Sequence, residues 1–157
     1  MTLTVREMQA QDVPACVAII NHTIALGGST AYEDPYSESD FAAHYFEETK
    51  VVVVALSEGR IVGFQGSFEV EPGVFSIGSF TDQQNPVRGA GAAMFEKTRT
   101  DCKHVGGTSI LDKITEDNTA GLAYYSKMGF QPDHVIKNDH TRPNGTVVDR
   151  IVKRFVL

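Results

Sequence analysis

The chain has 157 residues, 41% of them hydrophobic, which is the length of one domain with enough apolar residues to form a core. The formal net charge of -6 argues against a nucleic-acid-binding surface. The longest apolar run, residues 51–56, is too short to cross a bilayer, and the first residues lack the pattern of a signal peptide. We therefore expect one domain over residues 1–157, located in the cytoplasm and bound to neither nucleic acid nor membrane.

Neither the cysteines nor the histidines show the spacing of a metal site. Cys16 and Cys102 each fall in a helical apolar pattern, where a buried free thiol is the usual role. The five histidines are scattered without His-x-x-x-His spacing. We predict no bound metal.

Apolar periodicity and turn residues predict a mixed α/β domain in the order β-α-α-β-β-β-α-β-α-β-β, with about seven strands. Apolar residues spaced by three and four indicate helices, whereas alternating or β-branched runs indicate strands. Segments with glycine and proline separate them. The expected strands are residues 2–8, 51–56, 61–70, 74–81, 108–114, 130–137 and 146–155. The expected helices are residues 13–26, a short helix after Ser37, residues 92–104, and a helix from the polar patch 115–118 to residue 127.

Two of these helices have a clear buried face, and one crossover is required. The first helix is expected to bury Val13, Val17, Ile20 and Ile24. The helix at 92–104 is expected to bury Phe95, Thr98, Cys102 and Val105. The strand-helix-strand unit over residues 74–114 needs a parallel pair of strands.

The strongest functional signal is the segment Arg88-Gly89-Ala90-Gly91-Ala92-Ala93, between a strand and a helix. The first N–H groups of a helix have no intrahelical acceptor and lie at the positive end of its dipole, and glycine lets them approach an anion. The segment therefore favours a diphosphate site, although a glycine pair can also simply form a tight turn. Met94 stands where a dinucleotide fingerprint needs its third glycine, and the Gly-Lys-Ser/Thr of a P-loop is absent.

The second signal is the helical segment 118–130. Asn118 is a capping residue at its start and Gly129 ends it. Tyr124 and Tyr125 are adjacent, so their side chains point about 100° apart on a helix. Both cannot face the core, and one of them should reach a polar partner or a cleft.

The two segments together resemble the GNAT superfamily of N-acetyltransferases. Arg88-x-x-Gly91-x-Ala93 is similar to its Gln/Arg-x-x-Gly-x-Gly/Ala motif, and 118–130 is similar to its second motif, with an Asn, a Tyr and a closing Gly-Phe. Either motif alone is weak, but the pair with one strand between them is specific. The predicted element order is also similar to the GNAT fold, a central twisted mixed sheet with helices on both faces.

The resemblance implies an acyltransferase that uses acetyl-CoA as cosubstrate and acetylates an amine. It implies that the strands at 74–81 and 108–114 splay apart, with the pantetheine arm between them and the diphosphate at the turn before the helix. The cofactor-binding residues it implies are Ser79, Phe80, Thr81, Val87, Arg88, Gly89, Ala90, Gly91, Ala92, Ala93, Asn118 and Lys127, with Lys127 and Arg99 near the 3′-phosphate.

The resemblance also assigns the acid of the reaction. Tyr125 matches the family tyrosine that protonates the departing thiolate, and Tyr124 would then face the core. A phenol can supply such a proton when it is held in place.

The base stays open, because the third meander strand has no carboxylate where relatives often have a glutamate. We expect a water relay helped by Glu69 or Asp82, while His22 and Glu33 lie near the first loop.

The loops at 26–35 and 138–144 are expected to select the acceptor. Asn21-His22 followed by Ser29-Thr30-Ala31-Tyr32 resembles the subgroup that acetylates small amino acids and phosphinothricin-like compounds. We therefore favour the primary amine of a small molecule or amino acid as acceptor. A protein or peptide N-acetyltransferase and a non-catalytic acetyl-CoA sensor remain as alternatives, and the resemblance is compatible with a homodimer.

Overall fold

Seven strands form one mixed sheet in the order β1-β2-β3-β4-β5-β7-β6 in the computed structural model, which describes residues 2–157. The strands are β1 (Leu3–Glu7), β2 (Val51–Ser57), β3 (Arg60–Glu71), β4 (Val74–Thr81), β5 (Ser109–Thr115), β6 (Gln131–Thr141) and β7 (Val147–Val156). The helices are α1 (Val13–Leu26), α2 (Glu38–Phe41), α3 (Ala90–His104) and α4 (Thr119–Lys127). A 3₁₀ turn, η1 (Ala10–Asp12), precedes α1, and a π turn, η2 (Ala42–Glu47), continues α2.

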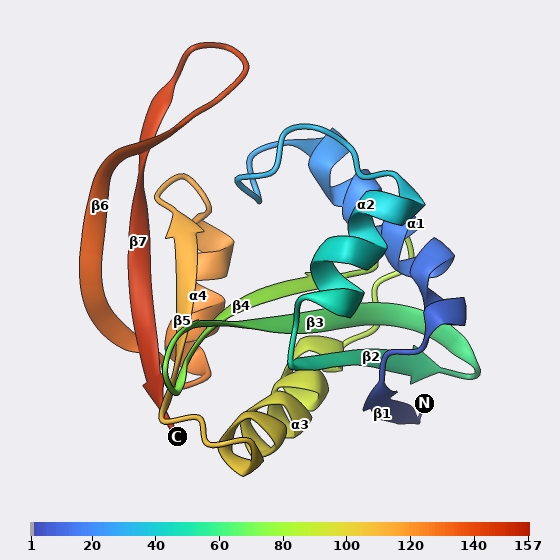
Figure 1. Cartoon of the computed structure of the whole chain (residues 1–157). Helices are drawn as coiled ribbons and strands as arrows, with labels where there is room; N and C mark the ends of the chain where they lie inside the picture. The colour runs from blue at the N-terminus through green and yellow to red at the C-terminus, as the bar shows by residue number, and fades with distance from the viewer. Residues whose placement is uncertain (1) are drawn as a thin grey trace.

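The helices cover both faces of the sheet, and the predicted fold class and element order are confirmed. Figure 1 shows α1 and α2 on one side of β2, β3 and β4, and α3 on the other side. The β6–β7 hairpin lies beside β5 at the far edge of the sheet. Two predicted ranges were inaccurate: α3 begins at Ala90, and β6 continues to Thr141. None of the helices within residues 2–157 has the length and apolar character needed to span a membrane.

The parallel pair in the middle of the sheet is short. β4 and β5 are paired only from Val74 opposite Ser109 to Ser76 opposite Leu111. Beyond these residues β4 stays paired with β3, and β5 stays paired with β7. The two strands therefore diverge, and the facing edges of residues 77–81 and 112–115 are left without a strand partner. The splay that the family resemblance implied is present.

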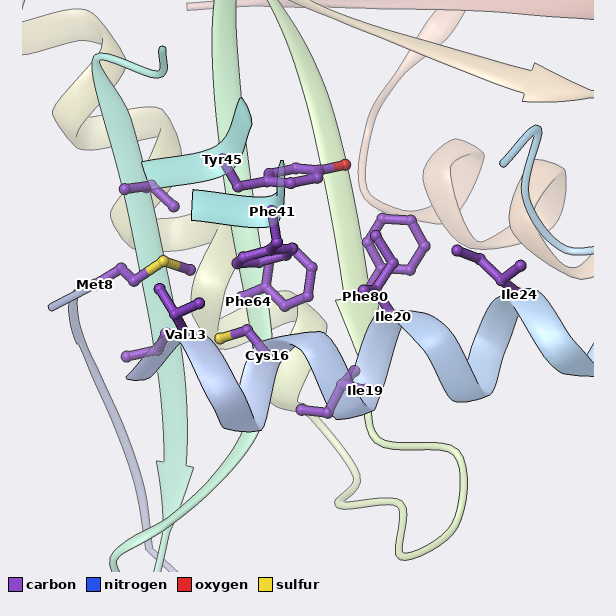
Figure 2. Packing of buried hydrophobic residues seen from close by; sticks show 12 residues of the cluster. Met8, Val13, Cys16, Ile19, Ile20, Ile24, Phe41, Tyr45, Phe64 and Phe80 are labelled. Carbon is purple, nitrogen blue, oxygen red and sulfur yellow. The ribbon is translucent and has the colours of Figure 1, made fainter. Parts of the chain in front are cut away.

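The core between the α1–α2 face and the sheet is rich in aromatic rings. Phe41, Tyr45 and Phe64 are fully buried, with ring centroids 5.1–5.2 Å apart. Figure 2 shows Ile20 and other side chains of α1 pointing toward this group. The expected α1 face is confirmed, since Val13, Ile20 and Ile24 are buried and Val17 packs against them.

The ring of Tyr45 lies over two glycines that are paired across β3 and β4. Gly66 faces Gly78 in the sheet register. A Cβ atom built on Gly66 would lie 2.7 Å from the Tyr45 ring, and one on Gly78 would lie 2.8 Å from the Tyr45 hydroxyl oxygen. These two positions need glycine because the tyrosine occupies the space that a side chain would fill.

A second core cluster lies under α3. Phe95, Thr98 and Cys102 are buried there as expected, but Val105 is 45% exposed. Val105 is the residue that ends α3, with φ −91° and ψ 17°, so it no longer follows the periodicity of the helix. Cys16 and Cys102 are buried free thiols, as predicted, and burial raises the pKa of Cys16 to about 12 and that of Cys102 to about 11.

We predict that Gly78→Ala lowers the free energy of unfolding by about 1–3 kcal/mol, because its Cβ overlaps the Tyr45 hydroxyl. Tyr45→Phe removes the nearest atom, so the double variant should recover part of that loss. Urea unfolding of the four proteins in this double-mutant cycle measures the coupling. Gly66→Ala is the matched control, because its Cβ meets the ring and not the hydroxyl. If Tyr45→Phe recovers as much stability in Gly66→Ala as in Gly78→Ala, the Tyr45 hydroxyl is not the group that excludes a side chain at position 78.

Candidate active site

A cavity of about 900 Å³ occupies the gap between β4 and β5. It is lined from the α3 side by the start of that helix and from the η2 side by aromatic residues. The predicted site residues that line it are Ser79, Phe80, Thr81, Val87, Gly89, Ala90, Gly91, Ala92, Asn118 and Tyr125. Residues separated by almost 50 positions in the sequence therefore share one cavity.

The turn before α3 has the geometry expected of an anion site. Gly89 has φ +87°, a left-handed conformation that favours glycine, and it immediately precedes the helix. The N–H of Ala90 donates to the Val87 carbonyl, and that of Ala93 donates to the Gly89 carbonyl. Gly91 and Ala92 are the second and third residues of α3, whose N–H groups a helix cannot satisfy internally. Their N–H groups are thus available to a negatively charged ligand.

Gln65 holds this turn against the sheet. It is fully buried on β3, and its Nε2 donates to the Ser79 hydroxyl (3.1 Å) and to the Gly91 carbonyl (3.3 Å). Its Oε1 accepts a hydrogen bond from the Thr98 hydroxyl at 2.7 Å. Gln65 was not among the predicted site residues, although a polar residue inside an apolar strand is a signal, because buried polar groups need partners.

Tyr124 and Tyr125 both line the cavity, so the prediction that Tyr124 faces the core is wrong. Tyr124 is 38% exposed, and its hydroxyl lies over Gly91, where a Cβ would overlap it. Tyr125 packs its ring against Phe130, with centroids 5.3 Å apart. The core under α3 therefore accepts the ring of Tyr125, while the 100° step along the helix turns Tyr124 toward the turn before α3.

The side chain of Tyr125 is partly buried and lines the cavity together with Ser79 of β4 and Asp112 of β5. Both of these side chains affect the pKa of its hydroxyl. Burial is the main reason that its pKa is raised well above the usual value, and the nearby Asp112 charge adds to this rise. Tyr125 therefore keeps its proton at neutral pH.

Asp112 is the carboxylate that the sequence analysis did not identify. It is 6% exposed, lines the cavity, and within residues 2–157 its Oδ2 has no hydrogen-bond partner. Burial raises its pKa to about 7, against the opposing effects of the Lys113 backbone, the Tyr125 hydroxyl and the charge of Lys153. Asp112 lies among the mainly apolar strand residues 109–114, and a carboxylate in such a strand was the signal in the sequence.

The two carboxylates proposed to assist the base are not brought to the cavity. Glu69 accepts hydrogen bonds from Lys50 (2.7 Å) and from the Gly73 N–H in the β3–β4 turn, and the Lys50 bond lowers its pKa. Asp82 pairs with Arg60 at 2.6 Å and accepts backbone N–H groups of the following turn. Both are held in local ion pairs at opposite ends of β4.

Several other predicted residues also lie outside the cavity lining. Arg88 and Lys127 are exposed, Ala93 is half-buried, and Arg99 pairs with Glu96 on the surface of α3. Asn118, by contrast, does line the cavity. Its Oδ1 caps α4 by accepting the Gly121 N–H, and its Nδ2 donates to the Ser29 carbonyl. It thereby joins α4 to the loop after α1.

Arg142 joins the two loops that were expected to select the acceptor. It is 7% exposed and donates to the carbonyls of Gly28 and Thr30 and to the carboxylates of Glu33 and Asp117. Because both loops share this one cation, they are held together as a unit.

The remaining two base candidates of the sequence analysis, Glu33 and His22, lie away from the cavity. Glu33 also accepts from His140 at 2.6 Å and lines a separate cavity of about 620 Å³. His22, on α1, is not part of either lining. Within residues 2–157, no three His, Cys, Asp or Glu side chains gather as a metal site.

Comparisons with known proteins agree with this geometry. The acetyltransferase (GNAT) family model matches residues 22–130, more than half of the chain. No curated protein matches the chain in sequence. The chain belongs to the GNAT family of acetyltransferases, as its motifs predicted, and it is therefore an acyltransferase.

Solved structures share the fold at low sequence identity. An N-acetyltransferase from Staphylococcus aureus Mu50 is similar with a TM-score of 0.88 and 16% identity, over 99% of both chains. A ribosomal-protein-alanine N-acetyltransferase from Brucella melitensis has a TM-score of 0.86 and 17% identity, over 98% of this chain and 99% of that one. A phosphinothricin acetyltransferase from Sinorhizobium meliloti, in complex with AcCoA, has a TM-score of 0.88 and 21% identity, over 100% of this chain and 89% of that one.

We predict that Asp112 makes the protein less stable as the pH rises. Its folded pKa of about 7 exceeds the ordinary value of 3.8, so the folded state binds more protons than the unfolded state between these values. The free energy of unfolding should fall across that window, and Asp112→Asn should remove this part of the fall, on the order of a few kcal/mol. Urea unfolding from pH 4 to pH 8 measures it. The exposed Asp34→Asn is the control, and a slope in Asp112→Asn equal to that of wild type would contradict the prediction.

Proposed function

We propose that the chain transfers the acetyl group of acetyl-CoA to the primary amine of a small molecule or amino acid by direct attack. The observation that carries this proposal is that one cavity contains both the start of α3 at Gly91 and the phenol of Tyr125. A cofactor bound by its diphosphate at the first would extend through the gap toward the second.

The cofactor would use the backbone more than side chains. The diphosphate would accept N–H groups at Gly91 and Ala92, and the pantetheine amides would pair with the free edge of β4 near Ser79. Asn118 would orient the cofactor from the start of α4. No metal takes part in this proposal, and Lys127 and Arg99 stay as predicted contacts of the 3′-phosphate on the exposed rim.

The chemistry follows from the groups around the gap. A neutral amine attacks the thioester carbonyl, and the oxyanion that forms would accept a backbone N–H of β4. The C–S bond then breaks, and the Tyr125 hydroxyl gives its proton to the thiolate. The burial that raises the pKa of Tyr125 would also raise the proton affinity of a thiolate left in the same cavity, so burial acts on the proton donor and the proton acceptor in the same direction.

Two observations support a small acceptor. The phosphinothricin acetyltransferase is a structural neighbour over the whole chain. Arg142 also holds the loop at residues 27–35 against the β6–β7 loop. The neighbour that acetylates ribosomal-protein alanine keeps a protein N-terminus as the second candidate. A panel of amino acids, phosphinothricin, polyamines and an alanine-terminated peptide, assayed by acetyl-CoA consumption, separates these acceptors. Tight CoA binding without turnover on any of them would favour the sensor alternative.

We predict that Tyr125→Phe lowers kcat by about 10²-fold with little change in CoA affinity, because it removes the proton donor and keeps the ring. Steady-state kinetics with the best acceptor and calorimetric titration of CoA measure the two quantities. Tyr124→Phe is the matched variant, and it should change CoA affinity more than kcat because its hydroxyl lies over Gly91. Unchanged kcat in Tyr125→Phe would remove the acid assignment.

A further inference from the structure

A chain of hydrogen-bonding side chains connects the cavity with the surface on the η2 side. The hydroxyl oxygens of Tyr45 and Tyr32 are 2.9 Å apart, and that of Tyr32 is 3.4 Å from Nε2 of His44. Nδ1 of His44 lies 3.3 Å from a carboxylate oxygen of Glu48. Tyr32, His44 and Tyr45 line the cavity, whereas the Glu48 side chain is 64% exposed.

The inner end of this chain lies where the thioester would react. The Tyr45 hydroxyl is packed against Gly78, next to Ser79 on the edge of β4 that faces the gap. Burial is the main cause of the raised pKa of Tyr45, and both Tyr32 and Tyr125 add to the rise. Tyr45 and Tyr125, which comes from α4, both line the cavity. The hydrogen-bonded side chains from Tyr45 to Glu48 and the proposed acid, Tyr125, approach the same gap from opposite faces of the sheet.

The donors and acceptors of the chain can be ordered in one direction. Either hydroxyl of the Tyr45–Tyr32 pair can be the donor, and in this direction Tyr45 donates to the Tyr32 oxygen. The Tyr32 hydroxyl then donates to Nε2 of His44, and the Nδ1 hydrogen of His44 donates to Glu48. Tyr32 lines the cavity, where its hydroxyl oxygen can accept an N–H from an ammonium group. The 3.4 Å contact would shorten when substrate binds, as catalytic hydrogen bonds often do.

The local backbone explains why His44 and Tyr45 both reach the cavity. They are adjacent residues within the π turn η2, a helix irregularity that is frequent at functional sites. His44 is held by a stacked contact with Phe68 of β3, with centroids 4.5 Å apart. The titratable groups that face it are Glu48, Tyr32, Tyr45 and the stacked Tyr36.

We propose that Tyr32 and His44 form the proton exit of the reaction, in which the Tyr32 oxygen takes a proton from the acceptor ammonium while its own proton passes to Nε2 of His44. The inference rests on the proposed function, and it provides the base that Glu69 and Asp82 do not supply. Histidine suits this place because it accepts and releases protons near neutral pH. Glu48 stabilises the imidazolium, which loses its proton to water at the surface.

The protons balance over one turnover. The ammonium loses one proton through Tyr32 to His44, and the neutral nitrogen then forms the C–N bond. As the C–S bond breaks, Tyr125 protonates the sulfur, and the nitrogen loses its second proton, which returns to the Tyr125 oxygen. One proton is released to water, the amide and the CoA thiol are the products, and no other reactant is needed.

The test uses two kinds of acceptor amine with His44→Gln and Tyr32→Phe. With a basic primary amine at neutral pH, both variants should lose about 10²-fold in kcat/KM, because the ammonium can no longer deliver its proton. The loss should shrink as the pH rises and the free amine becomes common. With hydroxylamine, which is largely neutral at neutral pH, both variants should lose far less than with the basic amine, once the uncatalysed reaction of hydroxylamine with acetyl-CoA is subtracted.

Matched controls separate this role from a structural one. His104→Gln makes the same change at an exposed position on α3, and it should leave both activities unchanged. The CoA affinity of every variant, measured by calorimetry, reports whether the cavity is intact. Equal losses with both amines, or no loss with either, would overturn the proton exit. Absence of turnover by the wild-type protein on every amine would overturn the proposed function itself, and the proton exit with it.

Discussion

The divergence of β4 and β5 after three paired residues is the constraint on which the rest of the site depends. Backbone N–H and C=O groups are costly to leave without partners, yet residues 77–81 and 112–115 face each other across a gap. The sheet tolerates this because β3 and β7 satisfy the outer edges of the same strands. The inner edges stay available to a ligand with amide groups, and the pantetheine arm of the proposed cosubstrate has such groups.

Several packing contacts keep the gap open in a defined shape. Tyr45 lies on the glycine pair of β3 and β4, so the aromatic core reaches the edge of the gap without a side chain between them. On the other face, Gln65 connects β3, β4 and α3 through three hydrogen bonds. These contacts fix the start of α3 relative to the free edge of β4, which sets the distance between the two ends of a bound ligand.

Buried and partly buried titratable groups gather at this gap. Tyr125 and Asp112 approach it from α4 and β5, while Tyr45 and Tyr32 approach it from η2 and the first loop. Burial raises the pKa of Asp112, Tyr45 and Tyr125, so all three hold protons more tightly than in water. The proposed reaction protonates a thiolate and takes protons from an amine, which needs two separate sets of groups, and the sheet separates the two sets named here.

The sequence by itself determined the features that depend on neighbours along the chain. Strand β4 has the predicted bounds, and the glycine turn at Gly89 and the cap at Asn118 lie where local patterns placed them. Their physical basis is backbone geometry and helix ends, which a few adjacent residues decide.

Only the tertiary structure decided which side chains meet at the gap. Asp112 and His44 come from separate elements, and long-range strand pairing and the π turn η2 bring them to one cavity, while Gln65 holds the turn before α3 beside it. The same packing placed Tyr124 over Gly91 and kept Glu69 in an ion pair with Lys50. Periodicity along one element states which residues share a face, but the contacts across elements decide what that face meets.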